Sequence, residues 1–159
     1  MLKRPKPTDN ISRKAADLVA RRPHFSKELE SKLLQRGYDH ESVLKEIQEF
    51  QTKGFLNDKE TAELYIEELK RKRHSRYDVT GRLVERGLPR GLADELVRTF
   101  FLENDERENI RYLLSKKRFS LNNIEDVKKA SDFFIRKGFR AELVRQIIGS
   151  KGDLDYTED

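Results

Sequence analysis

The sequence predicts an all-α protein built from three tandem three-helix repeats that form an elongated, curved helical array. Chain breakers are rare, with 8 glycines and 4 prolines among 159 residues. Charged residues make up 40% of the chain, so the core must be thin and most side chains solvated. A motif of a basic residue, a glycine and an apolar residue also recurs every ~50 residues, at Arg36–Tyr38, Arg86–Leu88 and Lys137–Phe139.

Aligning the glycines of this motif brings the flanking apolar residues into register. An apolar pair precedes each glycine by four and three residues, and Ile47, Val97 and Ile148 follow it by ten. Each glycine is expected just past a helix end, because glycine adopts the left-handed conformation there without steric cost. The preceding Arg or Lys then lies where the helix dipole favours a cation.

The first repeat is predicted over residues 12–56, after a basic N-terminal arm over residues 1–11. Its first helix is expected over Ser12–Arg22, and its second ends before the glycine of the first motif. The third helix is expected over Asp39–Lys53, because one stripe of that segment is apolar.

The second repeat is predicted over residues 57–103. Asn57, with Glu60 three residues later, has the pattern of a capping box and should begin a helix over Asp58–Lys72. The last helix of this repeat is expected over Pro89–Leu102, with the proline in its first turn.

The third repeat is predicted over residues 104–150, followed by an acidic flexible tail over residues 151–159. Its first helix is expected over Asp105–Lys117, its second is capped by Asn122, and its third covers Arg140–Ser150. Helix-supporting ion pairs are expected for Glu28–Lys32, Glu67–Arg71 and Glu68–Lys72.

The composition excludes several classes of protein. The absence of cysteine removes disulfides, iron–sulfur clusters, thiolate zinc sites and cysteine nucleophiles. No apolar run approaches the ~18 residues of a membrane span, and the basic N-terminus leads into no signal-like apolar segment, so we expect a cytoplasmic protein. The formal net charge of +5 favours a polyanionic partner.

Basic residues concentrate where the first helix of each repeat ends. In the third repeat this cluster has the same place as in the first and second, so we expect the three basic turns along one side of the array. As surfaces of this kind attract phosphates or an acidic protein groove, we take them as candidate partner-binding residues. They are Arg21, Arg22, Lys70, Arg71, Lys72, Arg73, Arg76, Arg82, Arg86, Arg90, Lys116, Lys117 and Arg118.

Each candidate also has a structural interpretation. Basic residues at a helix end can simply complement the helix dipole. Tyr77 and Phe119, beside the basic turns, can stack on bases, but we expect them to fill the core. The three histidines, His24, His40 and His74, are too scattered for a metal site and are expected at the surface or in turns. We predict no catalytic residue, cofactor or metal, because no nucleophile elbow, P-loop, dinucleotide fingerprint or buried carboxylate pair is present.

Several motifs, in order and spacing, resemble the RecX family, the small bacterial regulators of the RecA recombinase. They are Arg22–Leu29 continuing to Lys32–Leu33 and Arg36–Tyr38, then Gly54–Asp58 with Ala62 and Tyr65, then Leu83 with Arg86–Leu88. The likeness covers roughly residues 12–100 in letters, and the third repeat matches in layout.

The resemblance implies a non-enzymatic, monomeric protein that binds RecA and its DNA filament and modulates recombinase activity, most directly by inhibition, in DNA repair and the SOS response. An alternative from the residues themselves is a basic helical module that binds single- or double-stranded DNA, or RNA, independently of RecA. A third is a protein-binding scaffold whose basic stretches serve solvation only.

Overall fold

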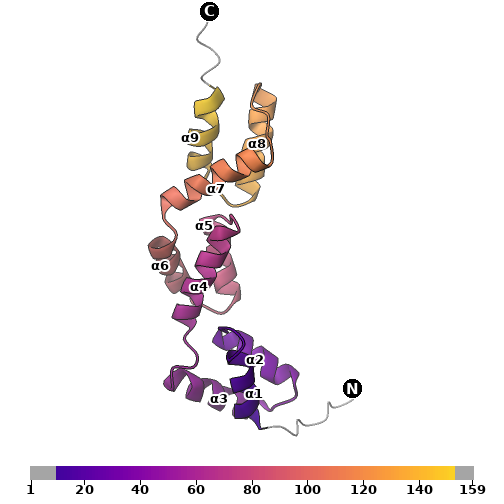
Figure 1. The fold of residues 1–159 in the computed structure, drawn as a ribbon, viewed down its shortest axis with the longest axis vertical. Coiled ribbons are helices and arrows are strands. Elements are labelled where there is room, and N and C mark those ends of the chain that lie inside the picture. The colour runs from indigo at the N-terminus through magenta and orange to yellow at the C-terminus, as the bar shows by residue number, and fades with distance from the viewer. Residues whose placement is uncertain (1–9, 153–159) are drawn as a thin grey trace, which may run out of the picture.

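The computed structural model describes residues 10–152, with side chains up to residue 149. This part of the chain contains nine helices and no strand, which confirms the predicted all-α class. The helices follow one another along an elongated array, with the N-terminal helices at one end and the C-terminal helices at the other (Figure 1). Residues 151–152 of the predicted acidic tail belong to the last helix, and the rest of the tail lies outside the described residues, as do residues 1–9 of the basic arm.

Three groups of three helices each enclose a separate hydrophobic cluster, and we call them units 1, 2 and 3. Unit 1 comprises α1 (Ile11–Val19), α2 (Ser26–Gln35) and α3 (His40–Thr52). Its cluster is formed by Ala15, Leu18, Leu29, Leu33, Val43, Ile47, Phe50 and Leu56. These residues recur at helical spacing, so each short helix buries one apolar stripe and leaves its charged side in water.

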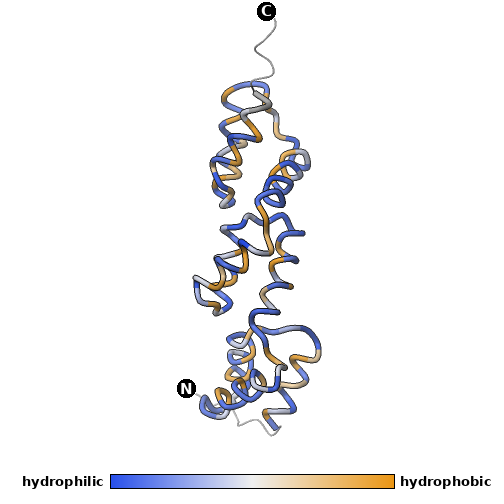
Figure 2. Tube along the Cα trace, turned by 90° about the vertical axis from the view of Figure 1, so that its left-hand side faces the viewer, coloured by the Kyte–Doolittle hydropathy of each residue, from blue (hydrophilic) through white to orange (hydrophobic). Residues whose placement is uncertain are grey.

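Unit 2 comprises α4 (Asp58–Arg71), α5 (Arg76–Glu85) and α6 (Arg90–Phe100). Its cluster draws on all three helices, yet it also contains Phe25, which precedes α2 of unit 1. Unit 3 comprises α7 (Glu103–Lys116), α8 (Ile124–Arg136) and α9 (Ala141–Gly152), around a cluster that includes Ile110, Phe134 and Ile148. Figure 2 shows apolar residues recurring as short stretches along every helix, as expected for small, thin cores.

The helix ends predicted from the glycine motif are confirmed. Gly37, Gly87 and Gly138 have φ values of 94°, 103° and 82°, so each occupies the left-handed region just after α2, α5 or α8. The amide of the following apolar residue closes each turn onto the preceding helix, as in Leu88 N–H donating to the Leu83 carbonyl at 3.1 Å. This sharp stop directs the chain into the last helix of each unit.

Several predicted boundaries were wrong by a few residues. Helix α1 ends at Val19 rather than Arg22. Pro23 disfavours a helix at the residue before it, and the turn between α1 and α2 carries Phe25 into the cluster of unit 2. Helix α7 begins at Glu103, two residues before the predicted start at Asp105. Asp105 lies in the first turn, where its carboxylate accepts a hydrogen bond from the Leu102 N–H at 2.9 Å. The cap of α8 is Asn123, one residue after the predicted Asn122, and it accepts the N–H of Asp126.

Helix boundaries elsewhere shift by one or two residues, with α6 and α9 beginning one residue after the predicted start. Pro89 precedes α6 at its N-cap. Of the three predicted ion pairs, Glu28–Lys32 and Glu68–Lys72 form at 2.8 Å and 2.5 Å. Glu67 instead pairs with Lys70 at 2.8 Å, because Lys70 turns toward the following unit.

Candidate functional site

The first predicted basic turn, between α1 and α2, is the junction between units 1 and 2. Phe25 is only 3% exposed and packs edge-on against Tyr65 of α4, with ring centroids 5.9 Å apart. The first amide of α2, that of Ser26, donates to the carboxylate of Asp58 at 2.7 Å. The Asp58 carboxylate, at the start of the next unit, thus accepts a hydrogen bond from a backbone N–H that has no acceptor within α2.

The second basic turn, between α4 and α5, is the junction between units 2 and 3. The first amide of α5, that of Arg76, donates to the buried carboxylate of Glu106 on α7 at 3.3 Å. Ser75 Oγ donates to the Lys137 carbonyl at 2.9 Å. Arg73 donates to Asn109 Oδ1 at 3.0 Å, and its guanidinium lies 4.4 Å from the ring centre of Tyr112.

The two junctions repeat each other. Lys27, the second residue of α2, approaches Gly87 so closely that an added Cβ would lie 2.9 Å from its side chain. Tyr77, the second residue of α5, approaches Gly138 in the same way, with its Cδ1 3.1 Å from such a Cβ. Gly87 and Gly138 therefore end their helices and, because they carry no side chain, also allow the preceding unit to pack closely against them.

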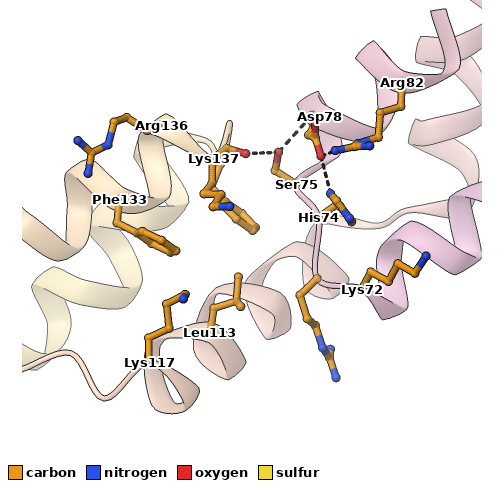
Figure 3. A pocket seen from close by; sticks show the side chains of 12 residues that line it. Lys72, His74, Ser75, Asp78, Arg82, Leu113, Lys117, Phe133, Arg136 and Lys137 are labelled. Carbon is orange, nitrogen blue, oxygen red and sulfur yellow. Dashed lines mark hydrogen bonds and ion pairs between the residues drawn. The ribbon is translucent and has the colours of Figure 1, made fainter. Parts of the chain in front are cut away.

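A cationic cleft with a volume of about 270 Å³ opens at the junction between units 2 and 3. Figure 3 shows side chains from the α4–α5 turn, α5, α7 and α8 around it; Lys117 and Phe133 point into it, whereas the charged ends of Lys72 and Arg136 point away from its centre. Six of the lining side chains are Lys or Arg, and one is acidic. The lining residues are Lys72, Arg73, His74, Ser75, Asp78, Arg82, Leu113, Lys117, Phe133, Arg136, Lys137 and Phe139.

The single carboxylate of the cleft is already engaged. Asp78 accepts from Arg82 Nε at 3.0 Å and lies 2.5 Å from His74 Nδ1 (Figure 3). Burial acts to raise the pKa of Asp78, but these two hydrogen bonds outweigh it and hold the pKa below its usual value. Arg82 correspondingly has a raised pKa, caused first by its hydrogen bond to Asp78.

The remaining cations lack comparable neutralisation inside the cleft. The ammonium groups of Lys117 and Lys137 lie 5.4 Å and 5.8 Å from the ring centre of Phe133, which places two positive charges over one aromatic ring. Arg136 is exposed, and Lys72 pairs with Glu68 outside the cleft. Like charges gathered around a partly enclosed cleft attract anions, so the site is suited to phosphate or carboxylate groups.

The sequence-predicted basic residues are distributed over more than one surface. Lys72, Arg73, Arg82 and Lys117 meet in the cleft. Arg22, Arg71 and Arg86 line a separate groove of about 520 Å³ at the junction of units 1 and 2. Arg76 and Arg118 line two further grooves, Arg90 pairs with Asp94 at 3.3 Å, and Arg21 and Lys116 are exposed.

Two predicted binding residues are also structural. Lys70 Nζ donates to the Phe100 carbonyl at 3.0 Å and pairs with Asp105 at 3.4 Å, which ties α4 to the start of unit 3. Burial acts to lower the pKa of Lys70, but the hydrogen bond to Glu67 and the nearby carboxylates leave it raised.

Arg22 pairs with both carboxylate oxygens of Glu28, which also bonds Lys32 and lies 3.6 Å from Arg86. Burial opposes ionisation of Glu28, yet the hydrogen bonds from Arg22 and Lys32 lower its pKa to about 2. The first basic turn is thus largely neutralised by its own acidic partner, whereas the cleft is not.

Sequence reasoning missed Arg136, Lys137 and Phe133 as parts of the site. Lys137 precedes Gly138 in the repeated motif, where the sequence indicates only a partner of the helix dipole, whereas Arg136 lies just before the motif; the sequence does not show that either approaches the second unit. It also missed the buried carboxylate of Glu106, which bonds Arg140 Nε at 3.1 Å. Only a helical-face analysis of the acidic first turn of α7 could have indicated it.

The two aromatic predictions had different outcomes. Phe119 packs against the cluster of unit 3, as expected. Tyr77 is 67% exposed, so the prediction that it fills a core was wrong, because its side chain lies along Gly138 at the junction rather than inside a unit. His24 is a turn histidine but is buried, with Nδ1 2.8 Å from the Arg22 carbonyl.

Within the described residues, no group of three or more His, Cys, Asp or Glu side chains is arranged to hold a metal ion. In the same part of the chain, no helix has the length and apolarity required to cross a bilayer.

The chain was compared with known proteins. No family model matches it. It is 31% identical to the regulatory protein RecX of Chlorobaculum tepidum over 137 residues, covering 84% of this chain and 83% of that one. It is 28% identical to the regulatory protein RecX of Pseudomonas putida over 149 residues, covering 92% and 94%. The match to RecX of Caldanaerobacter subterraneus, at 24% identity, covers 82% of this chain but 65% of that protein.

Two solved structures share the fold. The crystal structure of RecX from Lactobacillus salivarius superposes with a TM-score of 0.79 at 20% identity, covering 91% of this chain and 95% of that one. A second crystal structure of regulatory protein RecX gives a TM-score of 0.76 at 15% identity, covering 88% and 70%. With an all-helical fold in common and 31% identity over most of both chains in one relative, this chain belongs to the RecX family of regulatory proteins.

Proposed function

We propose that this protein is a non-enzymatic regulator in the bacterial cytoplasm that binds RecA and its DNA filament and inhibits recombinase activity during DNA repair and the SOS response. Family membership supports the regulatory part of the proposal. The elongated array supports the filament part, because a rod of three units presents a long surface to a long partner.

The observation that carries the proposal is the cationic cleft between units 2 and 3. A RecA filament on DNA is a polyanionic target, and the cleft offers six cationic side chains against one engaged carboxylate. No chemistry is assigned to the cleft, because the one carboxylate and the one histidine among its described lining residues bond each other, and the Ser75 hydroxyl donates to the Lys137 carbonyl.

The test is RecA-promoted strand exchange and single-strand-dependent ATP hydrolysis, with the protein added at substoichiometric amounts. We expect inhibition by the wild type and weaker inhibition by a variant with Arg136→Glu and Lys137→Glu. The matched control carries Lys128→Glu and Lys129→Glu, two exposed charge reversals on the same helix that lie outside the cleft. Absence of any effect of the wild type at any ratio would refute the proposal.

The charge of the cleft also favours a second candidate, a nucleic-acid-binding module that acts without RecA. In that case affinity for a single-stranded oligonucleotide should fall steeply with salt, because binding releases counterions. Binding to RecA filaments should survive salt concentrations that remove free DNA if the first proposal holds. A salt titration of both complexes separates the two functions.

A further inference from the structure

The turn that follows α7 in unit 3 is like the one that follows α4 at the second junction. Lys117 of this turn lines the cleft toward unit 2, whereas Arg118 and Phe119 line a different groove. Arg73 and Arg118 are the two non-glycine residues with positive φ in the described chain, at 65° and 51°, and each follows the first helix of its unit. The next amide bonds back to the helix in both, from His74 to Leu69 at 3.1 Å and from Phe119 to Leu114 at 3.4 Å. Residues 117–119 therefore repeat the geometry of residues 72–74.

The two turns differ in what covers them. At the second junction, α7 supplies Asn109 to bond the Arg73 guanidinium and Tyr112 to stack on it. Arg118 is exposed, and no described side chain bonds its guanidinium or stacks on it. Nearby Ile124 opens α8 with its side chain 82% exposed, where α5 has Arg76.

A groove of about 440 Å³ leads from this turn across α7 to α9. Arg107, Arg111 and Arg118 line it together with apolar side chains including Phe119 and Leu121, and none of the described carboxylates takes part in the lining. Arg107 is already paired with Glu103 at 2.9 Å, so Arg111 and Arg118 supply the uncompensated charge. A complementary occupant must therefore bring negative charge and some apolar surface.

We propose that this turn and groove, which we call the terminal groove, dock the acidic first turn of a helix from a partner protein. The same chain provides the precedent, because α4 and α7 begin with acidic first turns and each covers the basic turn before it. A second copy of this chain does not fit, because the helix it would present, α1, has no acidic residue in its first turn. The inference does not depend on RecA binding.

The experiment uses a fluorescent synthetic peptide of residues 102–116, which contains α7 and its acidic first turn, titrated into the full chain. The terminal groove predicts saturable binding, with NMR shift changes at Arg118, Phe119 and Leu121. We expect Arg118→Glu to weaken the peptide roughly tenfold or more, as for loss of a central charged contact, and Lys129→Glu to leave binding unchanged. A peptide with Glu103→Gln, Asp105→Asn and Glu106→Gln should also bind at least about tenfold more weakly.

Several results would overturn the proposal. Shift changes at residues 72–74 would mean that the peptide displaces the chain's own α7 instead. Binding that appears only after residues 153–159 are removed would make the chain's own C-terminal segment the occupant. Self-association that Arg118→Glu abolishes would indicate a second copy, and no detectable binding by the wild type would leave the groove without this role. The shift map is read on the wild type, so the test does not depend on the folding of a variant.

Discussion

Replacing Gly138 by alanine tests whether the glycine turns hold neighbouring units together as well as ending helices. Gly138 has φ +82°, and an added Cβ would lie 2.9 Å from Ser75 Oγ and 3.1 Å from Tyr77 Cδ1. Ser75 is buried, and its hydroxyl holds the Lys137 carbonyl at 2.9 Å. The hydroxyl cannot move aside without lengthening that bond.

Gly54 offers a matched control, because its φ of +77° is nearly the same and an added Cβ there would meet nothing within 4 Å. Gly54→Ala should lower the free energy of unfolding only by the strain of holding alanine in the left-handed conformation, about 1–2 kcal/mol. Gly138→Ala should cost the same amount plus the junction hydrogen bond, about 0.5–1.5 kcal/mol more. For a chain of this size each kcal/mol corresponds to a fall in Tm of about 2–4 °C.

Urea denaturation followed by circular dichroism measures both free energies of unfolding, and thermal melts provide the Tm. We expect Gly138→Ala to be the more destabilised variant and to weaken binding of anions in the cleft, because Lys137 precedes the altered residue. Equal losses for the two variants would refute the reasoning, since they would mean that unit 3 moves away from Ser75 at no cost.

Three further predictions concern the junctions. Glu28 has a folded-state pKa of about 2 against an ordinary value of 4.5, so its ~1–3 kcal/mol of stability is present above pH 4.5 and lost as pH falls toward 2. Urea titrations of Glu28→Gln and wild type should converge over that interval, and a constant difference would contradict the assignment. Glu106→Gln should lower the free energy of unfolding by ~1–2 kcal/mol, because it weakens the contacts to Arg140 and to the first amide of α5, while exposed Glu125→Gln should change it little. Phe25→Ala should cost about 3–5 kcal/mol and separate the melting of unit 1 from the rest, and a single unchanged transition would show that Phe25 does not couple the units.

Local sequence patterns predicted most of the secondary structure. The positions of Gly37, Gly87 and Gly138 and the apolar residues around them indicated the helix ends, because a left-handed stop and a helical stripe are local properties. Boundaries failed where a neighbouring unit intervened. The early end of α1 is an example, since the turn that follows it buries Phe25 in unit 2, although Pro23 also disfavours a helix at the residue before it.

The candidate site was predicted only in part. The basic character of the turns is visible in the sequence, but which cations converge is not, because it depends on how unit 3 packs against unit 2. Lys72 and Lys137 are 65 residues apart in sequence and line one cleft, whereas Arg71, next to Lys72, faces another groove.

The sequence by itself therefore determined the helices, their threefold repetition and the supply of positive charge, since these depend on residues within a turn or two of each other. The tertiary structure alone decided which charges remain available. Glu28 neutralises much of the first basic turn, Asp78 binds only Arg82 and His74 in the second, and Arg118 at the last turn meets no following unit among the described residues. The physical reason is that charge compensation depends on distances between units, and packing sets those distances.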